Sequence, residues 1–278
     1  MGPIKTVEKI ITLTAILAGL VACDRYQDIS RAAGLSESIT LGEPYRHRIF
    51  TNPAAQEKTA SERWHVYVEG DGRAVNSRGA PSLDPTPRTP LLLSMMAQDP
   101  RPGLYLGRPC YFHTDDPLCS PVNWTLARYS EETVSSMALA LHKHVTDDAP
   151  ITLIGHSGGG TLAVLLAARL KNVDQVVTLA GNLQVTKWTT FHHYSPLSLS
   201  LDPARQPPLS PCTRQYHLAG AQDQEILPDW IEEYSQTQPS SHFQQLNDAD
   251  HRTGWPLWWT LINIEPTIKT QRCDKVTR

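Results

Sequence analysis

Three segments of the chain carry residue types that could perform nucleophilic chemistry, and the first contains a serine. It is Gly155-His156-Ser157-Gly158-Gly159-Gly160, which matches the pattern G-x-S-x-G. An apolar run at 151–154 precedes it and an almost uncharged run at 161–170 follows it. A serine on a sharp turn between a strand and a helix needs small neighbours, because the backbone around it is crowded. We therefore expect Ser157 to be a nucleophile. The alternative, a glycine-rich phosphate turn, lacks both G-x-G-x-x-G and G-x-x-x-x-G-K-[ST].

The other two segments supply the base and the acid that a serine needs. A serine hydroxyl is a poor nucleophile until an imidazole takes its proton, and a carboxylate holds that imidazole in one tautomer. Asp223 follows the predicted strand at 215–219, and His251 follows the predicted strand at 242–246. The sequence thus predicts a triad of Ser157, Asp223 and His251.

Other residues could take the same roles. Four competitors for the acid stay open, although the last two lie too near His251 in sequence for the usual geometry: Glu225, Asp229, Asp248 and Asp250. His251 is favoured as the base because it alone follows the last predicted strand after the acid. We interpret His156, His192 and His193 as hydrogen-bonded or exposed rings.

Strands and helices alternate over nearly 200 residues. Apolar or alternating runs predict strands at 64–69, 104–106, 151–154, 176–180, 215–219 and 242–246, and helices at 90–96, from Ser130 to 145, at 161–170 and at 229–236. This order predicts an α/β fold with a mostly parallel sheet that is covered by helices on both faces. Such folds bind ligands beyond the carboxyl ends of their strands, where all three candidate residues lie.

These motifs make the chain, from about Trp64 onward, resemble the α/β-hydrolase family, whose triad follows the order Ser, Asp, His. The resemblance implies an oxyanion hole made by the backbone N–H of Gly158 and by one from the early loop Glu69-Gly70-Asp71-Gly72, assigned by position to Asp71. Many family members have His-Gly there, whereas this chain has Glu69-Gly70. The side chains of Glu69 and Asp71 must therefore point away or be satisfied by hydrogen bonds.

Two further segments lie beyond the triad motifs. The segment 181–211 contains Trp188, Phe191 and Tyr194, and family members often place a cap over the site at this point; a packed surface loop is the alternative. The tryptophans Trp255, Trp258 and Trp259 are spaced to pack a C-terminal helix rather than to bind substrate.

The first residues have the form of an export signal. A basic start precedes a short apolar run at 10–20, which is about half the ~20 residues that a bilayer-spanning helix needs. The run ends in Leu20-Val21-Ala22-Cys23, which resembles the lipobox of bacterial lipoproteins and implies lipidation of Cys23. We expect a signal peptide at 1–22, a lipidated tether at 23–37 and a hydrolase domain at 38–278. This implies a protein of the bacterial cell envelope, anchored to a membrane and facing the periplasm or exterior. Ordinary cleavage or an uncleaved anchor is the alternative.

Four cysteines remain after that signal. An even number in an exported chain predicts two disulfides, and we expect Cys110 with Cys119 and Cys212 with Cys273. Free buried thiols are the alternative. A zinc site is disfavoured because no C-x-x-C pair occurs.

The amino-acid composition limits which classes of function remain. The chain has 278 residues, of which 19% are charged, with a net charge of −3 and the two signs interspersed. Nucleic-acid binding needs a clearly basic face and is not expected. We expect a serine hydrolase that cleaves small-molecule or lipid carboxylic esters without cofactor or metal. An acyltransferase or peptidase with the same triad is the alternative, and a non-catalytic binding protein on this scaffold is the alternative of another class.

Overall fold

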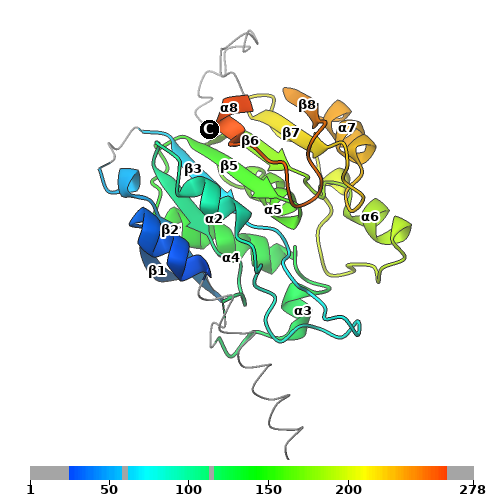
Figure 1. The fold of residues 1–278 in the computed structure, drawn as a ribbon, viewed down its shortest axis with the longest axis horizontal. Coiled ribbons are helices and arrows are strands. Elements are labelled where there is room, and N and C mark those ends of the chain that lie inside the picture. Colours follow the sequence, from blue (N-terminus) through cyan, green and yellow to red (C-terminus); the bar gives the residue numbers. More distant parts are fainter. Residues whose placement is uncertain (1–24, 58–61, 113–115, 262–278) are drawn as a thin grey trace, which may run out of the picture.

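A twisted eight-stranded sheet forms the centre of the molecule (Figure 1). The computed structural model describes residues 25–57, 62–112 and 116–261. The strands run in the order β1-β2-β4-β3-β5-β6-β7-β8. β1 pairs antiparallel with β2 and β2 with β4, and every other pairing is parallel. The strands are β1 (Ser36–Leu41), β2 (Arg46–Thr51), β3 (Trp64–Val68), β4 (Gly103–Leu106), β5 (Ile151–His156), β6 (Val173–Leu179), β7 (Arg214–Gly220) and β8 (Ser241–Leu246).

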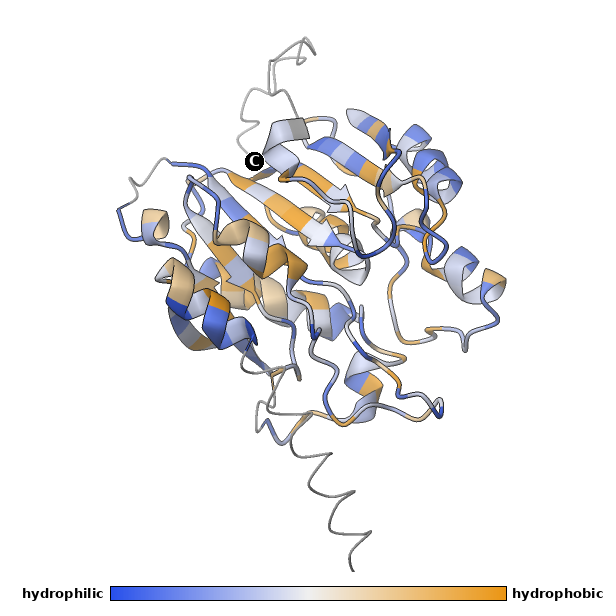
Figure 2. Cartoon of the chain, in the orientation of Figure 1, coloured by the Kyte–Doolittle hydropathy of each residue, from blue (hydrophilic) through white to orange (hydrophobic). Residues whose placement is uncertain are grey.

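Alternation along the central strands divides the core into two layers. In β3, Val66 and Val68 join one buried cluster while Tyr67 joins the other. Val176 and Val177 of β6 divide in the same way. Successive side chains of a strand point to opposite faces, so a strand buried on both sides is apolar throughout. Figure 2 shows this as orange strands at the centre of the molecule.

Helices cover both faces, as the alternating pattern predicted. One layer contains residues of α4 (Glu131–His142), α5 (Gly158–Ala167) and α7 (Pro228–Gln236), and the other contains residues of α2 (Leu91–Met96) and α8 (Trp258–Leu261). The shorter elements are η1 (Pro53–Ala55), α3 (Pro121–Trp124), α6 (Val185–Phe191) and η2 (Pro203–Arg205). Ser130 caps α4 as expected, since its hydroxyl accepts from the N–H of Thr133 at 3.1 Å.

The predicted tether is wrong for residues 25–37. Residues 25–33 form a helix and residue 36 begins β1, so the folded body starts thirteen residues before the expected boundary at 38. Tyr26 is only 1% exposed, and its ring lies edge-on to Phe112 with 4.8 Å between centroids. A single buried aromatic residue, Tyr26, docks this otherwise mostly polar helix, which is why composition alone suggested a tether.

The two antiparallel strands β1 and β2 were also not predicted. β1 is exposed at five of its six positions and polar at four of the six, because it is an edge strand that buries little.

The disulfide between Cys110 and Cys119 is confirmed, with a Cα–Cα distance of 5.4 Å. The second expected pair includes Cys273, which lies outside the described residues, as does Cys23. The disulfide between Cys212 and Cys273 and the lipidation of Cys23 remain predictions.

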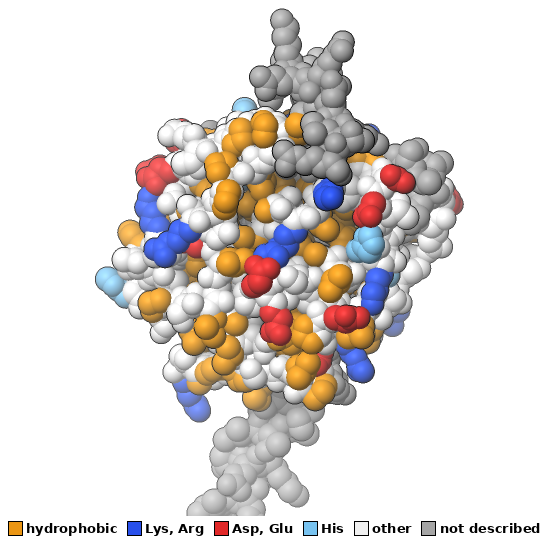
Figure 3. All heavy atoms as spheres, turned by 180° about the vertical axis from the view of Figure 1, so that it is seen from behind, with side chains coloured by type: hydrophobic (Ala, Val, Ile, Leu, Met, Phe, Trp, Pro, Cys, Tyr) orange, Lys and Arg blue, Asp and Glu red, His pale blue; other side chains and the backbone are white. Residues whose placement is uncertain are grey.

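Two of the three tryptophans near the C-terminus, Trp258 and Trp259, lie on α8 as expected, whereas Trp255 precedes that helix. Trp258 begins α8, is fully buried and donates its indole N–H to the hydroxyl of Tyr67 at 3.1 Å. Within the described ranges, none of the helices has both the length and the apolar character that crossing a bilayer requires. From behind, acidic and basic side chains are interspersed among apolar ones (Figure 3).

Replacing Tyr26 tests whether residues 25–33 belong to the folded body. Tyr26→Ala removes a buried ring and should lower the free energy of unfolding by about 3–5 kcal/mol, as truncation of large core aromatics does. Asp28→Ala on the exposed side of the same helix, which removes only a surface ion pair with Arg31, is the control and should change it by less than ~1 kcal/mol. Denaturant titration measures both. Equal stability of the two variants would contradict the docking of this helix.

Candidate active site

The turn that carries Ser157 joins β5 directly to α5. β5 ends at His156 and α5 begins at Gly158, so Ser157 alone makes the turn, with φ 53° and ψ −123°. A non-glycine residue in this region stores of order 1–3 kcal/mol of strain. A Cβ at Gly159 would overlap the carbonyls of Val68 and Glu69, so the turn tolerates only glycine at this contact. The predicted strand–turn–helix context is present.

The three candidate residues lie together at the carboxyl ends of β5, β7 and β8. Nε2 of His251 is 3.1 Å from Oγ of Ser157, and Nδ1 of His251 is 2.8 Å from Oδ2 of Asp223. The Asp223 side chain is fully buried, whereas that of His251 is 19% exposed. The order hydroxyl, imidazole, carboxylate is the one that proton transfer from a serine requires.

The loops themselves hold Asp223 in place. Its Oδ1 accepts hydrogen bonds from the backbone N–H groups of Glu225 at 2.8 Å and Ile226 at 2.9 Å, which leaves Oδ2 for His251. Two of the four competing acids are engaged elsewhere. Glu225 accepts from the indole of Trp188 at 3.0 Å, and Asp250 accepts from the N–H groups of its own turn at 2.7 Å. Asp229 lies in the first turn of α7.

His156 supports the loop that carries His251. Its Nε2 lies 2.7 Å from the carbonyl oxygen of His251, to which it donates. Burial lowers the pKa of His156 to about 4, so the ring is neutral at pH 7. The sequence interpretation of a hydrogen-bonded ring is confirmed, and the structure adds that the bond fixes the loop of the candidate base.

The loop after β3 crosses directly over the turn of Ser157. A Cβ at Gly70 would lie 3.3 Å from Cβ of Ser157, and one at Gly158 would overlap the Asp71 carboxylate and the Tyr129 hydroxyl. The loop that carries Asp71 is therefore adjacent to the turn of Ser157, and the assignment of the Asp71 N–H as the second oxyanion donor stays a prediction.

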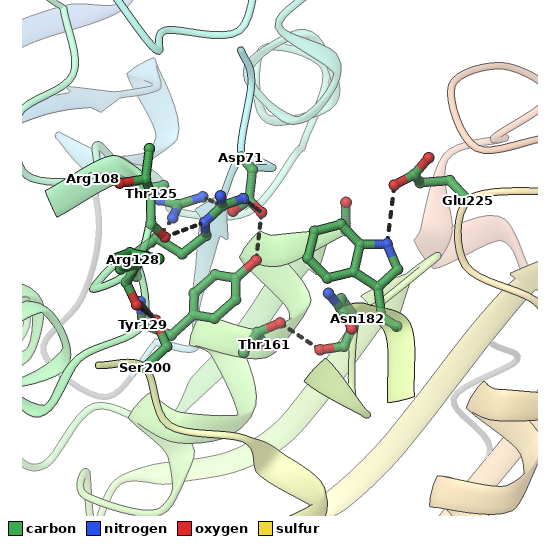
Figure 4. Close-up of polar contacts among 12 residues, drawn as sticks. Asp71, Arg108, Thr125, Arg128, Tyr129, Thr161, Asn182, Ser200 and Glu225 are labelled. Atoms are coloured by element: carbon green, nitrogen blue, oxygen red, sulfur yellow. Dashed lines mark hydrogen bonds and ion pairs between the residues drawn. The ribbon is translucent and has the colours of Figure 1, made fainter. Parts of the chain in front are cut away.

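The two acidic side chains of this loop are satisfied by hydrogen bonds. Glu69 is buried, and its Oε2 accepts from the N–H of Leu92 at the start of α2 at 3.0 Å. Burial raises the pKa of Glu69 to about 8, although that backbone bond acts in the opposite direction. Asp71 lies among Arg108, Arg128 and Tyr129 (Figure 4).

Sequence reasoning missed those last three residues. Arg108 and Arg128 are 37 and 57 positions from Asp71 and belong to separate loops, so no local motif joins them to it. The only available signal was the acidic loop itself, which required buried partners of opposite charge.

The insert 181–211 contributes α6 and η2 beside the acid turn. Trp188 and His192 of this insert both hydrogen-bond to Glu225, the latter from its Nε2 to the backbone oxygen at 2.8 Å. The insert thus packs against the segment that positions Asp223. The described part of the chain contains no cluster of three or more His, Cys, Asp or Glu side chains that could hold a metal.

Comparison with solved structures identifies the fold. A membrane phospholipase A described as a bacterial virulence factor superposes with a TM-score of 0.56 at 15% identity, covering 90% of this chain and 92% of that one. Est1E from Butyrivibrio proteoclasticus with ferulic acid bound gives 0.53 at 12%, covering 80% and 94%. The Pyrococcus furiosus esterase Pf2001 gives 0.53 at 10%, covering 80% and 86%. The chain adopts the α/β-hydrolase fold, as its motifs implied. No protein-family model matches the sequence, and comparison with curated proteins also found no match.

The buried carboxyl of Glu69 makes stability depend on pH. Its pKa is about 8 in the fold against 4.5 ordinarily. Below pH 4.5 ionisation of this carboxyl therefore costs no stability, and the free energy of unfolding falls as pH rises from 4.5 toward 8. The free energy of unfolding of Glu69→Gln, measured relative to the wild type, should therefore rise by roughly 2–4 kcal/mol from pH 5 to pH 8. Each pH unit in this window changes the wild-type free energy by up to ~1.4 kcal/mol. Chemical denaturation at both pH values measures this. Glu57→Gln, at an exposed position, is the control. Parallel pH curves for Glu69→Gln and the wild type would contradict the assignment.

Proposed function

We propose that this protein is a serine hydrolase that cleaves carboxylic esters through an acyl-serine intermediate. The observation that carries the proposal is the continuous hydrogen-bonded relay from Ser157 through His251 to the buried Asp223. In this arrangement the imidazole accepts the serine proton, and the carboxylate holds its tautomer and stabilises the imidazolium.

In the proposed mechanism the relay serves both halves of ester hydrolysis, the acylation of Ser157 and its deacylation. Oγ of Ser157 bonds to the ester carbonyl carbon, its proton passes to Nε2 of His251, and the carbonyl π electrons move onto oxygen. Collapse of this tetrahedral intermediate expels the alcohol, which takes that proton and leaves acyl-Ser157. Water then attacks the acyl-serine and gives a proton to His251. A second collapse releases the carboxylic acid and returns the proton to Ser157.

The oxyanion formed in both steps needs donors. We assign the backbone N–H of Gly158, which follows the nucleophile, and that of Asp71 on the loop above it. Each such donor is typically worth ~100- to 1,000-fold in kcat.

The proposed substrates are small-molecule or lipid esters. The solved structures that resemble this chain include a phospholipase A, an esterase, and Est1E with ferulic acid bound. The insert 181–211 would act as a cap, since its aromatic residues Trp188 and Tyr194 lie in edge contact at 5.1 Å and Trp188 bonds to the acid turn.

Replacing the nucleophile tests the function. Ser157→Ala should abolish hydrolysis of p-nitrophenyl esters, by at least about 10,000-fold in kcat, since the relay then has no attacking oxygen. The measurement is a panel of p-nitrophenyl esters from short to long acyl chains, with matched anilides to test amide cleavage. Ser38→Ala on the exposed edge strand β1 is the control and should keep wild-type rates. Ester turnover that survives in Ser157→Ala, with the fold intact, would refute the proposed mechanism.

We further propose that the protein is attached to a membrane of the bacterial envelope through a lipidated Cys23. The support is the lipobox-like run Leu20-Val21-Ala22-Cys23 after a short apolar stretch. Only Asp24 stands between Cys23 and the helix at 25–33, so a lipid anchor would hold the catalytic body close to the membrane surface. More than one acyl chain is needed for firm attachment, because a single chain binds only marginally.

Replacing Cys23 tests the anchor. Cys23→Ser should move the protein from the membrane pellet to the supernatant with unchanged specific activity, because the described hydrolase body contains every residue of the relay. Thr14→Ser, inside the apolar run, leaves the lipobox intact and should stay in the pellet. Fractionation after a high-salt wash measures both. A Cys23→Ser protein that still sediments would indicate an uncleaved anchor at 10–22.

A further inference from the structure

Two buried arginines and a tyrosine converge on one carboxylate beside the nucleophile. Arg108 Nη1 donates to Oδ1 of Asp71 at 2.5 Å, Arg128 Nη1 to Oδ2 at 2.8 Å, and the Tyr129 hydroxyl to Oδ2 at 2.5 Å (Figure 4). The Tyr111 hydroxyl donates to the backbone carbonyl of Asp71 at 3.1 Å. Asp71 is therefore fixed both at its side chain and at its backbone.

This cluster of Asp71, Arg108, Arg128 and Tyr129, here called the Asp71 cluster, lies against the residue that follows the nucleophile. The Asp71 carboxylate and the Tyr129 hydroxyl occupy the space that a Cβ at 158 would need. Gly70, the residue before Asp71, lies against Cβ of Ser157. The cluster is thus in contact with both sides of the proposed oxyanion hole.

The charges of the cluster do not cancel. Although burial alone acts the other way, the guanidinium groups of Arg108 and Arg128 and the Tyr129 hydroxyl hold the pKa of Asp71 well below its usual range, so its carboxylate is ionised. Two cations and one anion leave a surplus of one positive charge. Glu69 does not offset it at neutral pH, since burial raises its pKa to about 8.

The cluster also has more donors than acceptors. Nε of Arg108 is buried and has no hydrogen-bond partner among the described residues. The Arg108 guanidinium instead lies over the rings of Tyr111 and Tyr129, with 4.9 and 5.6 Å to their centroids. Aromatic faces attract a cation without neutralising it, so the surplus positive charge is retained.

We propose that the Asp71 cluster is the positioning element of the oxyanion hole: Arg108 and Arg128 lock Asp71 with its N–H at the hole, and their surplus charge stabilises the oxyanion. The inference rests on the proposed acyl transfer and adds two positioning residues to it. Charge that develops in a buried, preorganised site is stabilised far more than in water. The arginines also remove the repulsion that a lone Asp71 carboxylate would exert on the oxyanion.

Arg128 gives the sharper test, because Arg128→Gln removes the surplus charge and Arg128→Lys keeps it. The Gln variant should lose about 10- to 100-fold in kcat, less than the ~100- to 1,000-fold of a lost oxyanion donor, with KM changed less than about 3-fold. The Lys variant keeps the positive charge and a donor toward Asp71 but loses the bond from Nε of Arg128 to the Thr125 carbonyl, and it should recover to within about 5-fold of the wild type. Arg63→Gln is the matched control, since Arg63 also pairs with an aspartate, Asp174, but at the amino ends of the central strands, opposite the site.

A second readout separates charge from structure. A boronic acid bonds to the serine oxygen and becomes an anionic tetrahedral adduct, so its inhibition constant should rise in Arg128→Gln in proportion to the loss in kcat/KM. A merely structural role would lower the thermal midpoint and the amount of active enzyme without weakening the boronate selectively.

Each outcome decides the question. Wild-type kcat and boronate affinity in a folded Arg128→Gln protein would overturn the inference while leaving the proposed function intact. If Arg128→Gln does not fold, Arg128→Lys decides alone, because a 100-fold loss in kcat in that folded variant would contradict the charge account. A wild type that hydrolyses none of the esters would instead refute the proposed function, and the inference with it.

Discussion

The close contact of two backbone segments determines the rest of this candidate active site. The turn at Ser157 and the loop 68–71 cross very closely. A Cβ at Gly159 would overlap two backbone carbonyls, and a Cβ at Gly158 would overlap the Asp71 carboxylate. Because these two segments follow adjacent parallel strands, β5 and β3, the sheet register fixes their contact. The strained backbone of Ser157 persists because the buried strand on one side and the buried helix on the other leave it no alternative.

The crossing brings two acidic residues next to Ser157, the candidate nucleophile, and the fold accommodates each differently. Glu69 turns toward the first N–H groups of α2 and is held in its protonated form near neutral pH by burial. Asp71 stays ionised because two arginines from separate loops approach it. A buried charge is tolerated only when it is paired and hydrogen-bonded, so the loops that carry Arg108 and Arg128 are as necessary to this site as the loop that carries Asp71.

The sequence predicted the parts of the molecule that depend on local patterns. The strand before Ser157 contains a nearly continuous apolar run at 151–154, and Asp223 and His251 each follow a predicted strand, so these three residues could be named before their geometry was known. The parts that escaped prediction depend on contacts between distant residues. β1 is a polar edge strand, and the helix at 25–33 docks chiefly through Tyr26. Arg108 and Arg128 are joined to Asp71 only by the folded chain, and no spacing marks them.

The central claim is that one serine, activated by one histidine, attacks a carbonyl-like electrophile. The most direct measurement is peptide mapping by mass spectrometry after reaction with a fluorophosphonate, which bonds covalently to an activated serine oxygen. The account predicts a single phosphonyl adduct on the peptide that contains Ser157, and none on that peptide in His251→Ala. An adduct on another serine, or no adduct on a folded wild-type protein, would contradict it.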